Sequence, residues 1–168
     1  MHIRALTEAD AAPYRELRLR ALKEDPEAFG ASYKRSAQQP IEWFIERIRS
    51  KPNGSFTLGA FDQEQLIGTV GFVRDDGDKF IHKGDIWGMY VAPEFRGQDV
   101  GRALMLEAIK RVRAIDGLEH ISLGVMRTQT AARQLYASLG FKAWGIEPNA
   151  VQVNDRFIDE EFMYLKIS

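Results

Sequence analysis

The chain has 168 residues, of which 45% are apolar and 28% are charged, so it is long enough to bury one sizeable core and predicts a single domain over residues 1–168. A net charge of -1 and a pI near 6.3 offer no general attraction to nucleic-acid phosphates, so we expect no nucleic-acid partner and only a local anion site. The absence of cysteine excludes disulfides, thiolate metal sites and a cysteine nucleophile.

The three histidines are far apart in the sequence and show no metal-ligand spacing, which favours ordinary surface histidines over a metal site. The N-terminal segment carries charges throughout and lacks the apolar core of a signal peptide. No other run approaches the length of a membrane span. We therefore expect a cytoplasmic protein that binds neither a metal nor a membrane.

The first third of the chain predicts a strand followed by two helices. Thr7 can cap a helix over residues 8–23, where Leu17 and Ala21 share an apolar face. The next segment, "EDPEAFGASYKRSAQQP", has the composition of a loop, and a second helix is expected over residues 41–49.

The middle of the chain predicts three strands. Two β-rich runs, residues 55–62 and 65–74, are joined by a short polar segment and indicate an antiparallel hairpin. The third run, residues 84–92, contains Gly88 near its centre, which favours a bulge or a close backbone approach over a regular pleat.

The remaining chain predicts alternating helices and strands. An apolar stripe at helical spacing indicates a helix over residues 100–115, and "TAARQLYASLG" indicates a shorter one that Gly140 ends. Asn154 and Asp155 predict a two-residue turn between short strands. The expected strands in this part are residues 120–125, 141–146, the two arms of 151–158, and 162–167.

The stretch "VAPEFRGQDVGRALMLEAI" places a glycine-bearing loop directly before the helix over residues 100–115. A helix start has unpaired amide N–H groups and the positive end of a dipole, so such a loop can bind phosphate oxygens, with Arg96 and Arg102 on either side. Glycines before helices also serve as simple turn residues, and the loop alone does not decide between the two roles. The spacing matches neither a Walker loop nor a dinucleotide-binding fingerprint.

These residues resemble the acetyl-CoA motif of the GCN5-related N-acetyltransferase (GNAT) superfamily, with Arg96 and Gly101 at its two ends. The resemblance extends upstream through "DIWGMYVAPEF" and downstream through "LYASLGF". It implies an α/β (α+β) fold with a mixed, mostly antiparallel, twisted sheet flanked by helices. It also implies direct transfer of an acetyl group from acetyl-CoA to a primary amine of a small molecule or peptide.

The resemblance also assigns the cofactor-binding residues. The backbone of a bulged strand would pair with the pantetheine arm, the loop would hold the pyrophosphate, and a polar residue before the next helix would help to hold the cofactor. The residues in these positions are Met89, Tyr90, Val91, Arg96, Gly97, Gln98, Asp99, Val100, Gly101, Arg102, Gln129 and Tyr136.

Two positions depart from the family pattern. Asp99 stands where the family usually has glycine; aspartate tolerates left-handed backbone geometry, and we expect its carboxylate to point away from the phosphates. Gln129 stands where the family commonly has asparagine, and its amide keeps the same donors and acceptor.

Two residues are candidates for catalysis by this resemblance. Tyr136 matches the tyrosine that donates a proton or hydrogen bond to the leaving sulfur, although helical spacing alone favours a core position. Asp85 lies where relatives often have an acid that relays a proton through water. Other acids near the open end of the sheet are alternatives, and solvated surface carboxylates are the competing interpretation for all of them: Glu147, Asp159, Glu160 and Glu161.

The acceptor site is expected between the first two helices and the turn around Asn154, where Phe29, Tyr33 and Trp43 are candidate lining residues. The sequence does not identify the amine, and it is compatible with a homodimer. From a different functional class, a non-catalytic acyl-CoA-binding or sensing module remains the alternative.

Overall fold

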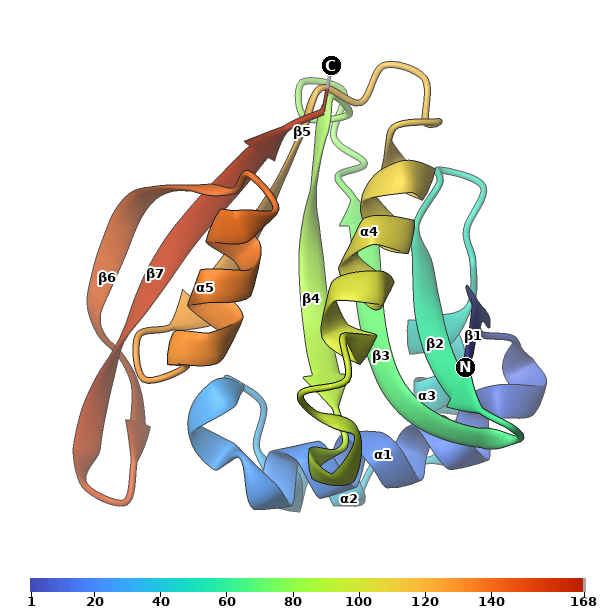
Figure 1. The fold of residues 1–168 in the computed structure, drawn as a ribbon, viewed down its shortest axis with the longest axis vertical. Helices are drawn as coiled ribbons and strands as arrows, with labels where there is room; N and C mark the ends of the chain where they lie inside the picture. Colours follow the sequence, from blue (N-terminus) through green and yellow to red (C-terminus); the bar gives the residue numbers. More distant parts are fainter. Residues whose placement is uncertain (168) are drawn as a thin grey trace.

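A seven-stranded sheet organises the chain in the computed structural model, which describes residues 1–167 (Figure 1). Its strand order is β1-β2-β3-β4-β5-β7-β6, and every neighbouring pair is antiparallel except β4 and β5. The mixed, mostly antiparallel sheet predicted from the sequence is thereby confirmed. The strands are β1 His2–Ala5, β2 Phe56–Asp62, β3 Gln65–Arg74, β4 Lys83–Val91, β5 His120–Met126, β6 Lys142–Val153 and β7 Arg156–Lys166.

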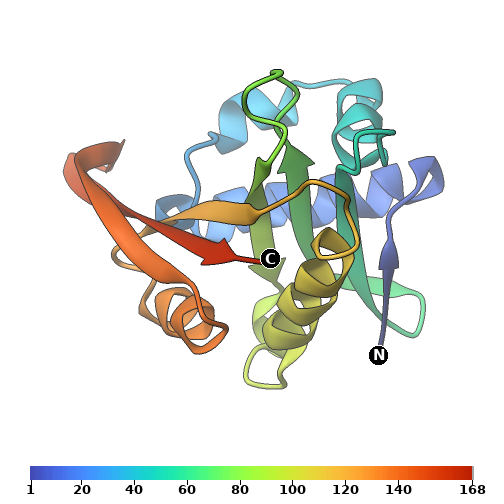
Figure 2. The same ribbon diagram turned by 90° about the horizontal axis from the view of Figure 1, so that it is seen from above.

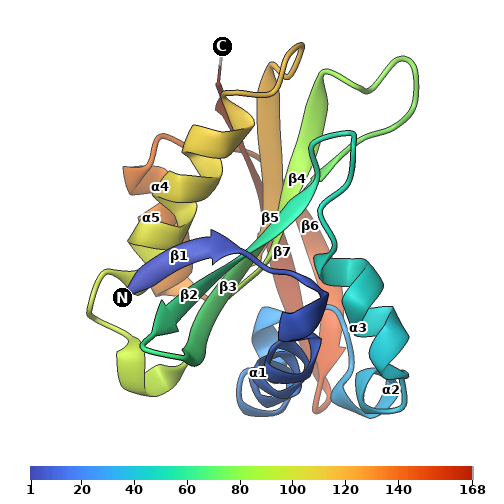
Figure 3. The same cartoon turned by 90° about the vertical axis from the view of Figure 1, so that its right-hand side faces the viewer.

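Helices cover both faces of this sheet. Figures 2 and 3 show α1, α2 and α3 on one face and α4 and α5 on the other. Three short 3-10 turns, η1 to η3, precede or follow helices. The bounds are η1 Glu8–Asp10, α1 Ala11–Glu24, η2 Pro26–Ala28, α2 Tyr33–Ala37, α3 Ile41–Ile48, η3 Pro93–Phe95, α4 Val100–Val112 and α5 Thr130–Ser138.

Each helical layer buries its own apolar cluster against the sheet. On the α4 face, Leu104 and Val112 are fully buried and pack with Phe72 and Ile121 of the strands. On the α1 face, a second cluster includes Tyr14, Phe44, Ile48 and Tyr90. Burial of these large side chains drives the folding of both layers onto one sheet.

The helix bounds differ most from the sequence prediction in three places. Residues 8–10 form η1 rather than the first turn of α1, α4 ends at Val112 instead of residue 115, and α2 lies in a segment predicted to be a loop. In α2 the side chain of Ser32 accepts a hydrogen bond from the Arg35 amide at 3.1 Å, a local cap that supports a single short helix without an apolar stripe.

The C-terminal part forms two long strands where the sequence predicted several short ones. The tight turn at Asn154 and Asp155 is confirmed, with φ angles of 48° and 62°. A register shift between Glu147 and Val151 interrupts the β6–β7 ladder, and Asn149 there has a φ of 55°. This irregularity replaces the predicted break, because the chain bends within a strand rather than leaving the sheet.

The parallel pair β4 and β5 positions the site. The two strands pair only over residues 83–85 and 120–122 and then diverge (Figure 1). The register of β3 on β4 shifts beside Gly88, which has a φ of +62°, and Thr69 Oγ1 donates to the Gly88 carbonyl at 3.2 Å. The predicted bulge is confirmed, and it accompanies a gap in the middle of the sheet.

Candidate active site

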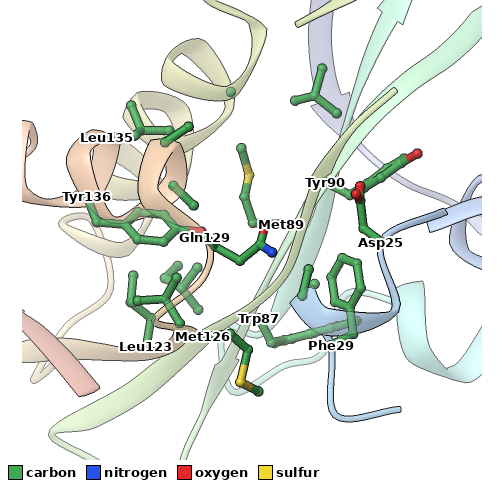
Figure 4. Close-up of a pocket in the computed structure, with 18 of the residues that line it drawn as sticks. Asp25, Phe29, Trp87, Met89, Tyr90, Leu123, Met126, Gln129, Leu135 and Tyr136 are labelled. Carbon is green, nitrogen blue, oxygen red and sulfur yellow. The ribbon is translucent and has the colours of Figure 1, made fainter. Parts of the chain in front are cut away.

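A cavity of about 620 Å³ lies where β4 and β5 diverge (Figure 4). Its walls come from both helical layers: Leu135 and Tyr136 belong to α5 on one face, whereas Arg18 and Arg47 belong to α1 and α3 on the other. The cavity therefore connects the two faces of the sheet through the gap between the strands. A reaction between two substrates that enter from opposite sides fits this geometry.

The loop before α4 forms one end of the cavity. Gly97 and Asp99 have left-handed φ angles of 73° and 59°, and the amide of Ala103 makes the first helical hydrogen bond, to the Asp99 carbonyl at 2.9 Å. The preceding amides of the first turn have no helical acceptor. A Cβ at Gly101 would lie 3.0 Å from Cε of Met89, so a larger side chain would intrude on the space between α4 and β4.

Side chains of the loop hold it in place. Arg96 donates to Asp25 Oδ2 at 2.6 Å and to the Val91 carbonyl at 2.9 Å. Arg102 donates to Ser138 Oγ at 3.0 Å, which ties the start of α4 to α5. Both arginines line the cavity, and each also braces the loop against a neighbouring element.

Tyr136 lies on the α5 wall and is only 6% exposed. Its ring contacts that of Phe141 with centroids 6.0 Å apart, and Figure 4 shows it opposite Phe29 across the cavity. Burial raises the pKa of the Tyr136 hydroxyl well above its ordinary value, so the group keeps its proton at neutral pH. It can act as a hydrogen-bond or proton donor inside the cavity.

The family model described as the acetyltransferase (GNAT) family matches residues 16–141. The chain belongs to this family. Among solved structures, an acetyltransferase of the GNAT family from Streptococcus pneumoniae is 25% identical, with a TM-score of 0.84 and 99% of each chain covered. A protein from Salmonella typhimurium, solved with its cofactor acetyl-CoA, shares the fold at a TM-score of 0.82 and 23% identity over 100% of this chain and 94% of that one.

The curated relatives match shorter segments. A mycothiol acetyltransferase from Renibacterium salmoninarum is 35% identical over 110 residues, which are 61% of this chain and 32% of the relative. An N-acetylaspartate synthetase from Danio rerio is 31% identical over 101 residues, 60% of this chain and 34% of the relative. The chain therefore spans about a third of the length of these relatives.

The predicted cofactor-binding residues of this GNAT chain gather around one cavity. Met89, Tyr90, Val91, Arg96, Gly97, Asp99, Val100, Gly101, Arg102, Gln129 and Tyr136 all line it. Gln98 does not, because its side chain turns back to donate to the Glu94 carbonyl at 3.1 Å. The carbonyl of Val91 accepts a hydrogen bond from Arg96, and Tyr90 lies opposite Thr69 in the β3–β4 ladder.

Asp85 does not lie in the cavity. It is exposed at the last residue pair before β4 and β5 diverge, and it faces Lys83, Asp75 and His120. Although the residue as a whole is exposed, neighbouring groups displace part of the water around its carboxylate, and this desolvation, together with the charge of Asp75, raises the pKa of Asp85. Asp85 lies on the predicted strand, opposite Ser122 of β5, but it is not among the residues that line the cavity.

Among the alternative acids, Glu160 alone lines the cavity. Glu161 binds Arg133 through two hydrogen bonds of 3.0 and 3.2 Å, and Asp159 accepts from the Asn149 amide at 2.9 Å. The Glu160 carboxylate lies directly against the bare Cα of Gly124. Burial, and then the charge of Glu147, raises the pKa of Glu160, as is typical of a general base.

The sequence does not indicate Arg18 and Arg47 as site residues, because single arginines in amphipathic helices form no motif. Of the predicted aromatic residues, Phe29 lines the cavity, whereas Trp43 lines a neighbouring cavity of about 410 Å³ and Tyr33 lines neither. Within residues 1–167, no group of three acids, histidines or cysteines is arranged to hold a metal ion. No helix in that range has the length and apolar character needed to cross a bilayer.

Proposed function

We propose that the chain transfers an acetyl group from acetyl-CoA to a primary amine. The observation that carries this proposal is the cavity between the diverging β4 and β5, which is open to both faces of the sheet and holds a protonated tyrosine and a carboxylate with a raised pKa. Membership of the GNAT family and the likeness to a structure solved with acetyl-CoA support the choice of acyl donor.

The loop before α4 is proposed to hold the pyrophosphate of acetyl-CoA. Its free amides and the positive end of the helix dipole suit an anion, and Arg102 adds a charge at the same end. The side chain of Asp99 makes no capping hydrogen bond to α4. The unpaired backbone of β4 around Met89 suits the amides of the pantetheine arm, because β5 has already diverged there.

The proposed reaction takes two protons from the acceptor nitrogen and gives one to sulfur. Glu160 removes the first proton of the acceptor ammonium group, and the amine nitrogen then attacks the acetyl carbonyl carbon. As the carbon–sulfur bond breaks, the electron pair goes to sulfur, Tyr136 donates a hydrogen bond or its proton to the thiolate, and the second nitrogen proton passes to water, which leaves the neutral amide. Glu160 and Tyr136 line the same cavity from β7 and α5 and so approach the reacting atoms from different walls.

The test is a panel of primary amines with acetyl-CoA, monitored by release of free thiol. Thiol release that depends on an amine, with the acetylated amine found by mass spectrometry, is the expected result. Calorimetry with CoA alone measures the donor site separately. CoA binding without thiol release from any amine would instead favour the non-catalytic acyl-CoA-binding or sensing module.

A further inference from the structure

Two arginines that the proposed reaction does not use line the cavity on the side of α1 and α3. Arg18 is only 9% exposed, and Arg47 is partly buried between the main cavity and its neighbour. Within residues 1–167, Nη1 of Arg18 and Nε of Arg47 are buried without a hydrogen-bond partner, and neither side chain forms an ion pair. Buried guanidinium groups without an acceptor are rare, because losing water without a replacement partner is costly.

Aromatic rings surround both cations without satisfying their donors. Cζ of Arg18 lies 4.6 Å from the centroid of Phe29. Cζ of Arg47 lies 4.6 Å from the Trp43 centroid and 4.5 Å from the Trp87 centroid. Aromatic faces attract a cation but accept no ordinary hydrogen bond, so the rings fix the two guanidinium groups and leave the N–H groups available.

Several other arginines of this chain have carboxylate partners. Arg4 binds Asp10 and Arg133 binds Glu161, each through two hydrogen bonds. In the part of the chain that the structure describes, Arg18 has no such partner although it is more buried than either. Burial lowers the pKa of Arg18; Tyr14 opposes this shift, and the nearby charge of Arg47 acts in the same direction as burial. An anion between the two arginines would relieve both effects.

We propose that Arg18 and Arg47 bind a carboxylate on the acceptor, so that the acceptor is a small amine of the amino-acid type. This rests on the proposed function, because it assigns the substrate of the same cavity. A guanidinium group matches the two oxygens of a carboxylate in geometry and charge. Glu160 supplies the opposite charge elsewhere in the same cavity, so the walls match an ammonium group and a carboxylate on one molecule.

The test compares matched acceptors in the thiol-release assay. Phenylalanine, methionine and leucine are each paired with the carboxamide and with the amine that lacks the carboxyl group. We expect kcat/KM for at least one amino acid to exceed that of its carboxamide by about tenfold or more, the size of a lost charge-assisted hydrogen bond. The aminophosphonate analogue of that amino acid is the third arm. A preference for the phosphonate would overturn the carboxylate assignment.

Variants connect the preference to the two side chains. Arg18→Gln and Arg47→Gln are each expected to raise KM for the amino acid about tenfold while changing kcat/KM for the carboxamide little. Arg18→Lys should restore part of the loss. Arg15→Gln is the matched control, because Arg15 lies on the same helix, donates to the Ala37 carbonyl at 3.3 Å and does not line the cavity.

The outcomes separate this inference from the proposed function. Equal use of acids and carboxamides, or an equal loss on both in the arginine variants, would overturn the carboxylate site and leave acetyl transfer standing. If no amine releases thiol, acetyl transfer fails, and calorimetry of the same acids and carboxamides in the presence of CoA decides the carboxylate site. The carboxylate site is supported if the acid binds to the parent chain and Arg18→Gln abolishes this binding. It is overturned if the acid and its carboxamide bind equally well. Thermal melts show that each variant is folded.

Discussion

At the scale of single residues, the main distinction is between charged groups that are paired and charged groups that face the cavity. Glu161 and Asp159 have partners within the fold, whereas the neighbouring Glu160 has a raised pKa and no ion pair within residues 1–167. Tyr136 is buried in the wall of the same cavity. Groups of this kind are costly to keep in a fold, which makes them the strongest candidates for chemistry.

Replacement of Tyr136 by phenylalanine separates its chemical role from its packing role. Tyr136→Phe keeps the ring beside Phe141 and removes the hydroxyl, so we expect kcat to fall by about a hundredfold while melting temperature and CoA affinity change little. Steady-state kinetics, a thermal melt and calorimetry make the comparison. Near-normal turnover in a well-folded variant would mean that solvent, and not Tyr136, protonates the thiolate.

The raised pKa of Glu160 predicts a change in pH dependence. A carboxylate base acts when it is deprotonated, so kcat/KM should rise as pH increases through the pKa of Glu160. Burial and the charge of Glu147 both raise that pKa, and Glu147→Gln removes the second cause. The acidic limb of the kcat/KM profile should therefore move to lower pH in Glu147→Gln. Glu160→Gln should lose the limb altogether, and an unchanged limb in both variants would rule out Glu160 as the base.

The sequence predicted one wall of the cavity better than the other. The loop from Arg96 to Gly101 and the "LYASLGF" segment are contiguous motifs, so residues around Tyr136 could be assigned from spacing and resemblance. Arg18, Arg47 and Glu160 come from three elements far apart in the chain, and only the tertiary fold brings them to one cavity. For Asp85 the sequence predicted the strand position, but the side chain does not line the cavity. A position along a strand does not by itself determine whether the side chain faces a site.

At the scale of elements, hydrophobic periodicity predicted most helices and strands to within a few residues. It failed for α2, a five-residue helix that depends on the Ser32 cap, and for the long strands β6 and β7. The β6–β7 ladder continues past Pro148 and Asn149 through a register shift. The local sequence pattern at these residues predicts the end of a strand instead. The gap between β4 and β5 was implied only by family resemblance and by the glycine at the bulge.

The approach of α4 to β4 provides a prediction at this scale. A Cβ at Gly101 would lie 3.0 Å from the flexible end of Met89 and 3.5 Å from Leu135 Cδ2. Gly101→Ala should therefore be tolerated, whereas Gly101→Val should push into the proposed pyrophosphate site and weaken CoA binding by about tenfold or more. Calorimetry with CoA measures both. Asp99→Gly is the control, with affinity expected to stay the same or improve slightly, and an unchanged affinity in Gly101→Val would remove the loop from the binding site.

At the scale of the whole molecule, Asp10 links the first strand to the first helix. Its carboxylate accepts two hydrogen bonds of 2.7 Å from Arg4 in β1 and one of 2.7 Å from the Thr7 amide before η1. Hydrogen bonding to Arg4, opposed by burial and assisted by Thr7, lowers the pKa of Asp10 to about 2. Because β1 pairs with β2 and α1 packs on the same sheet, this contact joins the N-terminal segment to the folded core.

Stability should therefore depend on pH through Asp10. The folded pKa lies below the ordinary value of 3.8, so the contribution is complete above that value and is lost as pH falls through about 2. Arg4 is 43% exposed, and after allowance for solvent screening we expect Asp10→Asn to cost about 1 kcal/mol of unfolding free energy at pH 7. Urea titrations at pH 7 and pH 2 should show that the difference from the parent chain shrinks at the lower pH. Glu94→Gln, which breaks an exposed pair with Arg20, is the control and should show no measurable loss. A loss in Asp10→Asn that is equal at both pH values would assign the effect to helix capping or packing instead of the ion pair.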